Sequence, residues 1–225
     1  ADPGQAAQWA FPMSNPVPGC WVHDSSARAH FLRTMAERYG SIESVNRAWH
    51  TAYSSYEELD YPKDAEASRY WLDFVNWYHD SFTEMMGLLL AIAKKHFPKT
   101  PTAVNLGWPF EKVNHGQDLT GLVKVAKQEG VIIRCPTGPM VPFLYTKRVA
   151  TAAHFYGLSE FSSEPIDGNA KPDEIAMALF KDLTTAVTWH FDYLGNLERT
   201  PEYYAHFAEL LPLPYPEVDI AFFFS

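Results

Sequence analysis

Cysteine and regularly spaced metal ligands are scarce in this sequence of 225 residues. Only two cysteines, Cys20 and Cys135, are present, which is too few for a disulfide framework. Cys135 ends the apolar run Val131–Cys135, a setting typical of a buried thiol. The nine histidines show no HxxxH spacing, and no CxxC pair occurs, so the sequence predicts no metal site.

An excess of basic residues is also missing. The 18 Lys and Arg residues stand against 27 Asp and Glu residues, which gives a net charge of −9. That balance argues against a nucleic-acid partner and against binding to an anionic membrane surface. The longest strongly apolar run, over residues 85–93, is interrupted by Gly87 and is far too short to span a bilayer. No signal peptide is visible, so secreted and cytoplasmic locations both stay open.

The chain is rich in core-forming residues, with 47% hydrophobic and 15% aromatic content. From Thr102 onward, short apolar runs alternate with helical patterns. The pattern predicts strands over 102–108, 131–135, 158–164 and 186–193, and helices over 118–129, 146–155, 172–183 and 201–211. A strand–helix rhythm of this kind indicates a parallel sheet covered by helices, which is an α/β fold.

The N-terminal part follows a different pattern. Residues 8–14 form one more predicted strand, and a helical insertion over 25–97 comes next. Its first helix is predicted to begin at a Ser25 or Ser26 cap and to end at Tyr39, before Gly40.

Two further signals lie within this insertion. Ser55 and Glu58 have the spacing of a capping box. Beyond them, apolar residues recur at helical spacing up to Phe97, and Pro98 stops the pattern. The stripe consists of Trp71, Phe74, Val75, Tyr78, Phe82, Met85, Leu89 and Ile92. We interpret it as one long helix whose apolar face packs in a core.

The predicted units amount to an incomplete barrel. A (β/α) TIM-type barrel has eight strand–helix units, and about five are recognisable here. We therefore expect residues 1–214 to form the C-terminal part of a barrel, and 215–225 to be a linker leading into a following domain. An incomplete barrel exposes strand edges, which predicts either a companion segment or a homo-oligomer.

A carboxylate at a strand end is the strongest catalytic signal. Glu164 closes the strand predicted over 158–164, and side chains at the ends of barrel strands line the active-site mouth. Glu160 lies four residues earlier and is the alternative nucleophile, because alternation along a strand places both on one face. Arg134 is a charge within an apolar strand, so we expect it to pair with Glu164 or Glu160 and to contact substrate.

Other residues are candidates for sugar contact. Trp189 lies on the last predicted strand, where its ring is placed to stack on a sugar; its neighbour Phe191 fits core packing better. Asn105 and Trp108 end the 102–108 strand and are as compatible with a structural role as with the barrel mouth. Trp21 is a further candidate in a segment that otherwise reads as a loop.

The segment from Phe31 to Ser55 resembles the family-42 β-galactosidases, which have a helix ending in Tyr-Gly followed by a Leu-Asn-x-Ala-Trp-Gly-Thr segment. Here these are Tyr39-Gly40 and Asn46-Arg47-Ala48-Trp49-His50-Thr51. The resemblance implies a retaining glycosidase without a cofactor, acting on β-galactosides. The spacing from Gly157 to Glu164 then makes Glu164 the nucleophile.

One segment departs from that family. Where the family has Asn-Glu, with Glu as general acid, this chain has Asn15-Pro16. The resemblance leaves Asn15 to hold the sugar 2-hydroxyl, and only Asp24 and Glu111 stand out as weak substitutes for the acid. The alternatives are therefore a non-catalytic sugar-binding or structural barrel module, or one part of a larger glycosidase. In each case the predicted partner is a carbohydrate.

Overall fold

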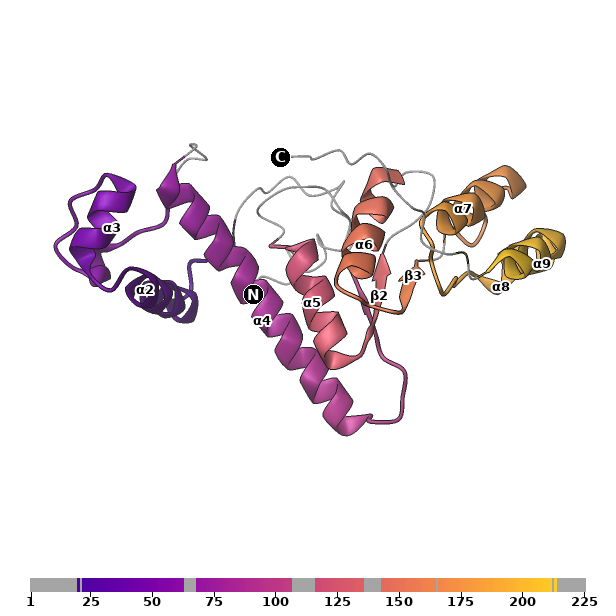
Figure 1. The fold of residues 1–225 in the computed structure, drawn as a ribbon, viewed down its shortest axis with the longest axis horizontal. Helices are drawn as coiled ribbons and strands as arrows, with labels where there is room; N and C mark the ends of the chain where they lie inside the picture. The colour runs from indigo at the N-terminus through magenta and orange to yellow at the C-terminus, as the bar shows by residue number, and fades with distance from the viewer. Residues whose placement is uncertain are drawn as a thin grey trace. The chain divides into compact units, whose positions relative to one another are not determined.

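The computed structural model describes residues 20, 22–62, 68–106, 116–135, 143–164, 166–211 and 213 (Figure 1). The chain divides into two units. The helical unit comprises Met13–Met86 and Glu111–Asp118, and the sheet unit comprises Ala1–Pro12, Gly87–Phe110 and Leu119–Ser225. None of the described helices is long and apolar enough to cross a membrane.

The helical unit begins with α2, Ser25–Tyr39. The Asp24 carboxylate accepts hydrogen bonds from the backbone amides of Ser26 and Ala27, both at 2.9 Å. The predicted cap at Ser25 or Ser26 is therefore wrong by one or two residues, since a carboxylate just outside the helix satisfies its free amides. Gly40 ends the helix as predicted, with a φ of 73° that favours glycine.

Two short elements follow. Helix α3 covers Ile42–Trp49, and the Ser41 side chain caps it by accepting from the Ser44 amide. The predicted capping box instead opens η2, a single 3₁₀ turn over Tyr56–Glu58 in which Ser55 makes no side-chain cap. The Glu58 carboxylate accepts from the Ser54 amide at 2.7 Å, so the pattern closes a turn rather than starting a helix.

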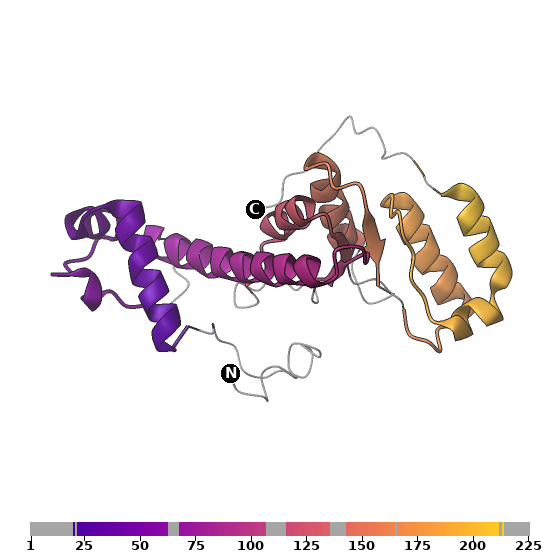
Figure 2. The ribbon, with the colours of Figure 1, turned by 90° about the horizontal axis from the view of Figure 1, so that it is seen from below.

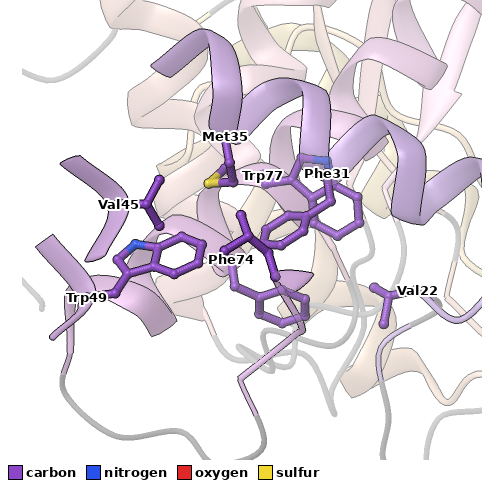
Figure 3. Close-up of a cluster of buried hydrophobic side chains, with 8 residues drawn as sticks. Val22, Phe31, Met35, Val45, Trp49, Phe74 and Trp77 are labelled. Carbon is purple, nitrogen blue, oxygen red and sulfur yellow. The ribbon is translucent and has the colours of Figure 1, made fainter. Parts of the chain in front are cut away.

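An aromatic cluster forms the core of the helical unit (Figure 3). Phe31 lies at its centre, with ring centroids 5.0 Å from Trp77 and 6.3 Å from Trp49. The buried members are Val22, Phe31, Met35, Val45, Trp49, Leu59, Phe74 and Trp77. Because aromatic side chains bury large apolar areas, this cluster supplies most of the packing between the short helices.

Asp73 links three helices through its buried carboxylate. It accepts hydrogen bonds from Arg38 at 2.8 Å, from the Trp49 indole at 2.8 Å and from the Tyr39 hydroxyl, and Arg69 lies 3.0 Å away. Burial raises the pKa of this carboxyl, but the hydrogen bonds from Trp49 and Tyr39 outweigh it, with help from both guanidinium groups, and the net pKa is lowered. The spacing of Tyr39 and Trp49 thus reflects a shared structural partner.

The long helix α4 covers Arg69–His96, as its apolar period predicts. Phe74 and Trp77 are buried in the first part of the helix. In the second part, Met85 is 47% exposed and Leu89 is 51% exposed, so the prediction that the whole stripe packs in a core is wrong. A helical period shows which residues share a face, but it does not say what covers that face.

The sheet unit contains three parallel strands in the order β1-β2-β3. They are Ala103–Asn105, Ile132–Cys135 and Phe161–Ser163. In the described part of the chain, the helices that follow these strands are α5 Leu119–Glu129, α6 Phe143–Phe155, α7 Pro172–Thr184, α8 Leu194–Arg199 and α9 Pro201–Leu210. The predicted alternation is confirmed for the strands within 102–108, 131–135 and 158–164 and the helices that follow them. Helix α7 packs against α9 (Figure 2).

The strand predicted over 186–193 is reduced to a single bridge. Trp189 pairs with Ser162 in parallel orientation, and the amides of Thr188 and Trp189 both donate to the Phe161 carbonyl. Ala186 has a φ of 56°, so the backbone turns at the point where the strand was expected to begin.

One face of the sheet is covered by helices. Ile133 and Cys135 of β2 are fully buried, and the Cys135 thiol is hydrogen-bonded to Thr146 of α6. Ser163, the register partner of Cys135, donates to Asp182 of α7 at 2.6 Å. Because successive residues of a strand point to opposite faces, the intervening residues must lie on the other side of the sheet.

Candidate active site

Four residues from neighbouring chain segments form a row on the sheet face opposite Cys135 and Ser163. Asn105 pairs with Arg134, Arg134 pairs with Ser162, and Ser162 forms the bridge to Trp189. Adjacent strands lie about 4.8 Å apart, and paired residues project to the same side. The row therefore brings three predicted substrate contacts together: Asn105, Arg134 and Trp189.

Glu164 belongs to the same face, one step nearer the carboxyl edge. Its amide donates to the Cys135 carbonyl at 2.7 Å, which extends the ladder one residue past β3. Alternation then places the Glu164 side chain on the side of Ser162, and the residue is partly exposed. A carboxylate at this edge has the position expected for a reacting group in a barrel mouth.

Arg134 has a different partner from the one predicted. It forms no ion pair with Glu164 or Glu160; its guanidinium carbon lies 5.4 Å from the centroid of the Phe191 ring. The Arg134 Nε atom is buried without a hydrogen-bond partner. An aromatic face attracts a cation electrostatically, so Phe191 takes the place of the predicted carboxylate.

The Phe191 ring also faces Trp189. The two rings are stacked at 6.4 Å with an interplanar angle of 14°, and Trp189 is 46% exposed. Phe191 is 40% exposed, so the preference for core packing at this position is wrong. We call this pair of near-parallel rings beside Arg134 the aromatic platform.

The remaining predicted site residues have different outcomes. Glu160 is exposed and precedes β3, so it lies at the amino edge of the sheet. Because it is not part of the strand, alternation does not place it on the same face as Glu164. Asp24 is exposed and caps α2 in the helical unit. The other predicted residues lie outside the described part of the chain: Asn15, Trp21, Trp108 and Glu111.

Behind the platform lies a buried polar network that the sequence did not predict. His190 Nδ1 is 2.5 Å from Asp182 Oδ2, and His190 Nε2 is 3.5 Å from Asp192 Oδ2. Asp192 also accepts from Asn196 at 2.7 Å and from the Tyr204 hydroxyl. Alternation in the Trp189–Tyr193 segment predicts that the side chains of His190 and Asp192 point away from the side of the exposed rings. It does not predict that Asp182, on helix α7, contacts His190.

The network holds His190 in its charged form. Burial lowers the pKa of the imidazole, yet the hydrogen bond to Asp182 and the nearby Asp192 carboxylate, 3.5 Å from Nε2, outweigh it and raise that pKa to about 9. For Asp192, burial raises the pKa, and hydrogen bonds from His190, Tyr204 and Asn196 bring it below the ordinary value. In the described part of the chain, no group of three or more His, Cys, Asp or Glu side chains is arranged to hold a metal ion.

Sequence comparison places the chain in a family. The model of glycosyl hydrolase family 14 matches residues 3–121, more than half of the chain. The beta-amylases of Cytobacillus firmus and Niallia circulans are each 28% identical over 100 residues, which is 41% of this chain and 21% and 17% of those proteins. The thermophilic beta-amylase of Thermoanaerobacterium thermosulfurigenes is 24% identical over 110 residues, 42% of this chain and 20% of that protein. These alignments thus span about a fifth of the curated relatives.

Structure comparison agrees on the fold. The crystal structure of the catalytic domain of beta-amylase from Paenibacillus polymyxa superposes with a TM-score of 0.68 at 19% identity, over 92% of this chain and 59% of that domain. This likeness confirms the predicted fold class, an α/β barrel fold that is incomplete in this chain.

The resemblance to the family-42 β-galactosidases is therefore wrong as a family assignment. Its most specific residues, Tyr39 and Trp49, converge on Asp73 inside the helical unit. The spacing between Tyr39 and Trp49 reflects packing around Asp73, so it does not identify the chemistry of a site built on the strands. The family match covers that same helical segment, and by this match the chain belongs to glycosyl hydrolase family 14.

Proposed function

We propose that this chain forms part of a beta-amylase-like glycoside hydrolase that cleaves glycosidic bonds in a starch-type glucan. The single observation that carries the proposal is the row of Asn105, Arg134 and Trp189 beside Glu164 on one sheet face. Family membership supplies the reaction class, and the names of the relatives supply the substrate class. A β-galactoside substrate was implied only by the family-42 resemblance and has lost that basis.

The side chains of this face have complementary roles. The Trp189 and Phe191 rings present a flat apolar surface to the carbon–hydrogen face of a sugar ring. Arg134 and Asn105 carry side-chain N–H donors for sugar hydroxyls. Glu164 supplies one of the two carboxylates that hydrolysis of a glycosidic bond requires, and it stabilises an oxocarbenium-like transition state.

The test is the release of reducing ends from soluble starch and from maltoheptaose by the full-length protein. We expect Glu164→Gln to lower kcat by about 10²–10⁴-fold while glucan affinity is kept, because the amide preserves shape and removes the charge. Glu160→Gln, at the other end of β3, is the matched variant and should keep the wild-type rate.

Three outcomes would contradict the proposal. Failure of the wild-type protein to hydrolyse either glucan would remove the substrate class. Glucan binding without turnover would support the sugar-binding module instead. Loss of activity in Glu160→Gln but not in Glu164→Gln would move the reacting carboxylate to the amino edge of the strand.

A further inference from the structure

The backbone beneath the aromatic platform has little support of its own. The Ser163 amide donates to the Trp189 carbonyl at 3.3 Å, the last ladder bond in the described part of this segment. Phe191 comes two residues later, between His190 and Asp192, whose side chains are both tied into the buried network. Side chains on the covered face, rather than sheet pairing, therefore fix the backbone that carries Phe191.

Every element packed around His190 contributes to its anchoring. Ser163 of β3 lies 3.3 Å from Nδ1, and Asp182 of α7 lies 2.5 Å from the same atom. Tyr204 and Phe207 of α9 place their ring centroids 5.8 Å and 5.2 Å from the imidazole. The titratable groups facing the imidazole are thus Asp182, Asp192 and Tyr204, and the His190 side chain is only 7% exposed.

We propose that His190 is a positioning residue that holds the Trp189–Phe191 platform in place for a glucan. The proposal rests on the proposed function, and it adds a buried residue that does not touch the sugar. The imidazole is hydrogen-bonded to Asp182 through Nδ1, while Nε2 lies 3.5 Å from Asp192 without a hydrogen bond, so a charged imidazolium attracts both carboxylates at once. A neutral imidazole keeps the bond to Asp182 but no longer attracts Asp192, so the segment between His190 and Asp192 loosens.

Protonation of His190 and platform geometry are therefore coupled. Below about pH 9 the imidazolium attracts both carboxylates, and the two rings keep their near-parallel arrangement beside Arg134. Above that pH the attraction to Asp192 is lost, and Phe191 moves relative to Trp189. The consequence is weaker glucan binding at alkaline pH without any titrating group in contact with the sugar.

The first test measures maltoheptaose affinity by calorimetry from about pH 6 to about pH 10 in the full-length protein. Wild-type affinity should fall about tenfold with a midpoint near pH 9, which is the loss of one good contact. In His190→Asn the side-chain amide keeps a donor for Asp182 and cannot titrate, so its affinity profile should be flat. A profile with the wild-type midpoint in His190→Asn would overturn the proposal.

A second readout needs no sugar. The fluorescence contribution of Trp189, obtained as the difference between wild type and Trp189→Phe, should change with a midpoint near pH 9 and should not change in the His190→Asn background. If wild type binds no maltoheptaose at any pH, the proposed function fails, and this signal still decides the role of His190. A pH-independent Trp189 signal in wild type would overturn the positioning role.

Asp192→Asn keeps the proposal testable if His190→Asn does not fold. Its amide oxygen still accepts hydrogen bonds, but the lost charge removes one cause of the raised pKa of His190. The midpoint of the Trp189 signal should move down by about one pH unit or more. An unmoved midpoint would mean that a different group controls the platform.

Discussion

The guanidinium of Arg134 lies over the ring of Phe191, 5.4 Å from its centroid, on the same sheet face as Glu164. Arg134 comes from strand β2 and Phe191 from an irregular segment, and the two residues are far apart in the sequence. The contact leaves the buried Nε of Arg134 without an acceptor. The residue as a whole is partly exposed, so the other N–H groups of its guanidinium are the donors available to the hydroxyl groups of a bound glucan.

Replacing Arg134 by Met should therefore weaken binding more than it weakens the fold. We expect maltoheptaose affinity to fall about tenfold, since a hydrogen bond to a charged group contributes ~1.5–3 kcal/mol. The free energy of unfolding should change by less than about 1 kcal/mol, because one partly exposed cation–π contact is lost. Calorimetry and urea denaturation measure the two effects.

Lys124 offers the matched control for this change. Its ammonium lies 4.9 Å from the centroid of the Tyr156 ring, so Lys124→Met removes a contact of the same kind from helix α5. Affinity should be unchanged in this variant. Equal losses of affinity in the two variants would show that Arg134 acts through general charge and not through contact with the glucan.

The buried carboxylate of Asp73 should dominate the stability of the helical unit. Asp73→Asn leaves Arg38 and Arg69 without a charged partner and disturbs the bond to the Trp49 indole. We expect a loss of about 2–4 kcal/mol in the free energy of unfolding, followed by tryptophan fluorescence in urea. Asp80→Asn, an exposed position on the same helix, is the control and should stay within about 0.5 kcal/mol of wild type.

The pH dependence of this contribution has a definite sign. The folded pKa of Asp73 is lowered, so the folded state binds its proton less readily than the unfolded chain does. The stabilisation is present above the ordinary carboxyl value of about 3.9 and is lost as the pH falls through the lowered pKa. Equal acid sensitivity of wild type and Asp73→Asn would contradict this assignment.

Local sequence signals predicted the elements well and their partners poorly. The helix predicted over 118–129 matches α5, because apolar period and flanking residues act within one segment. The bond between Asp182 and His190 depends on how a helix docks on a strand, which no local period encodes. The edge position of the last predicted strand, reduced to the Trp189 bridge, is likewise a property of the whole sheet.

The candidate site shows the same limit. Glu164 and Trp189 were predicted from strand ends and alternation, which are local rules, and the two residues lie on the same sheet face as Arg134. The prediction of a carboxylate partner for Arg134 was wrong because the ring of Phe191, which comes from another segment, lies against the guanidinium. The family resemblance misled for a related reason, since Tyr39 and Trp49 report packing around Asp73.

The two thiols should differ sharply in reactivity. Cys135 is fully buried, and burial raises the pKa of its thiol far above the ordinary value. Burial also raises the pKa of Cys20, but that side chain is only partly covered. Because the thiolate is the reactive form, a disulfide reagent should modify Cys20 slowly in the native protein and Cys135 only on unfolding. Cys20→Ser should abolish the native reaction, and a residual native signal in that variant would contradict the burial of Cys135.

Alkaline pH should destabilise the sheet unit through His190. Its folded pKa of about 9 lies above the unfolded value of 6.5, so the folded state holds the proton more tightly. The resulting stabilisation is complete below about pH 6.5 and is lost as the pH rises through about 9, a change on the order of 3 kcal/mol. Urea denaturation from about pH 6 to about pH 10 measures the slope.

Two variants separate this network from general charge effects. His190→Asn removes the titrating group and should flatten the alkaline slope. His206→Gln removes an exposed histidine that pairs with Glu209 on helix α9, and it should keep the wild-type slope, since a surface ion pair contributes little. If both variants retain the wild-type slope, the alkaline loss arises from another group, and the buried pair of Asp182 and His190 does not control the stability of the sheet unit in this pH range.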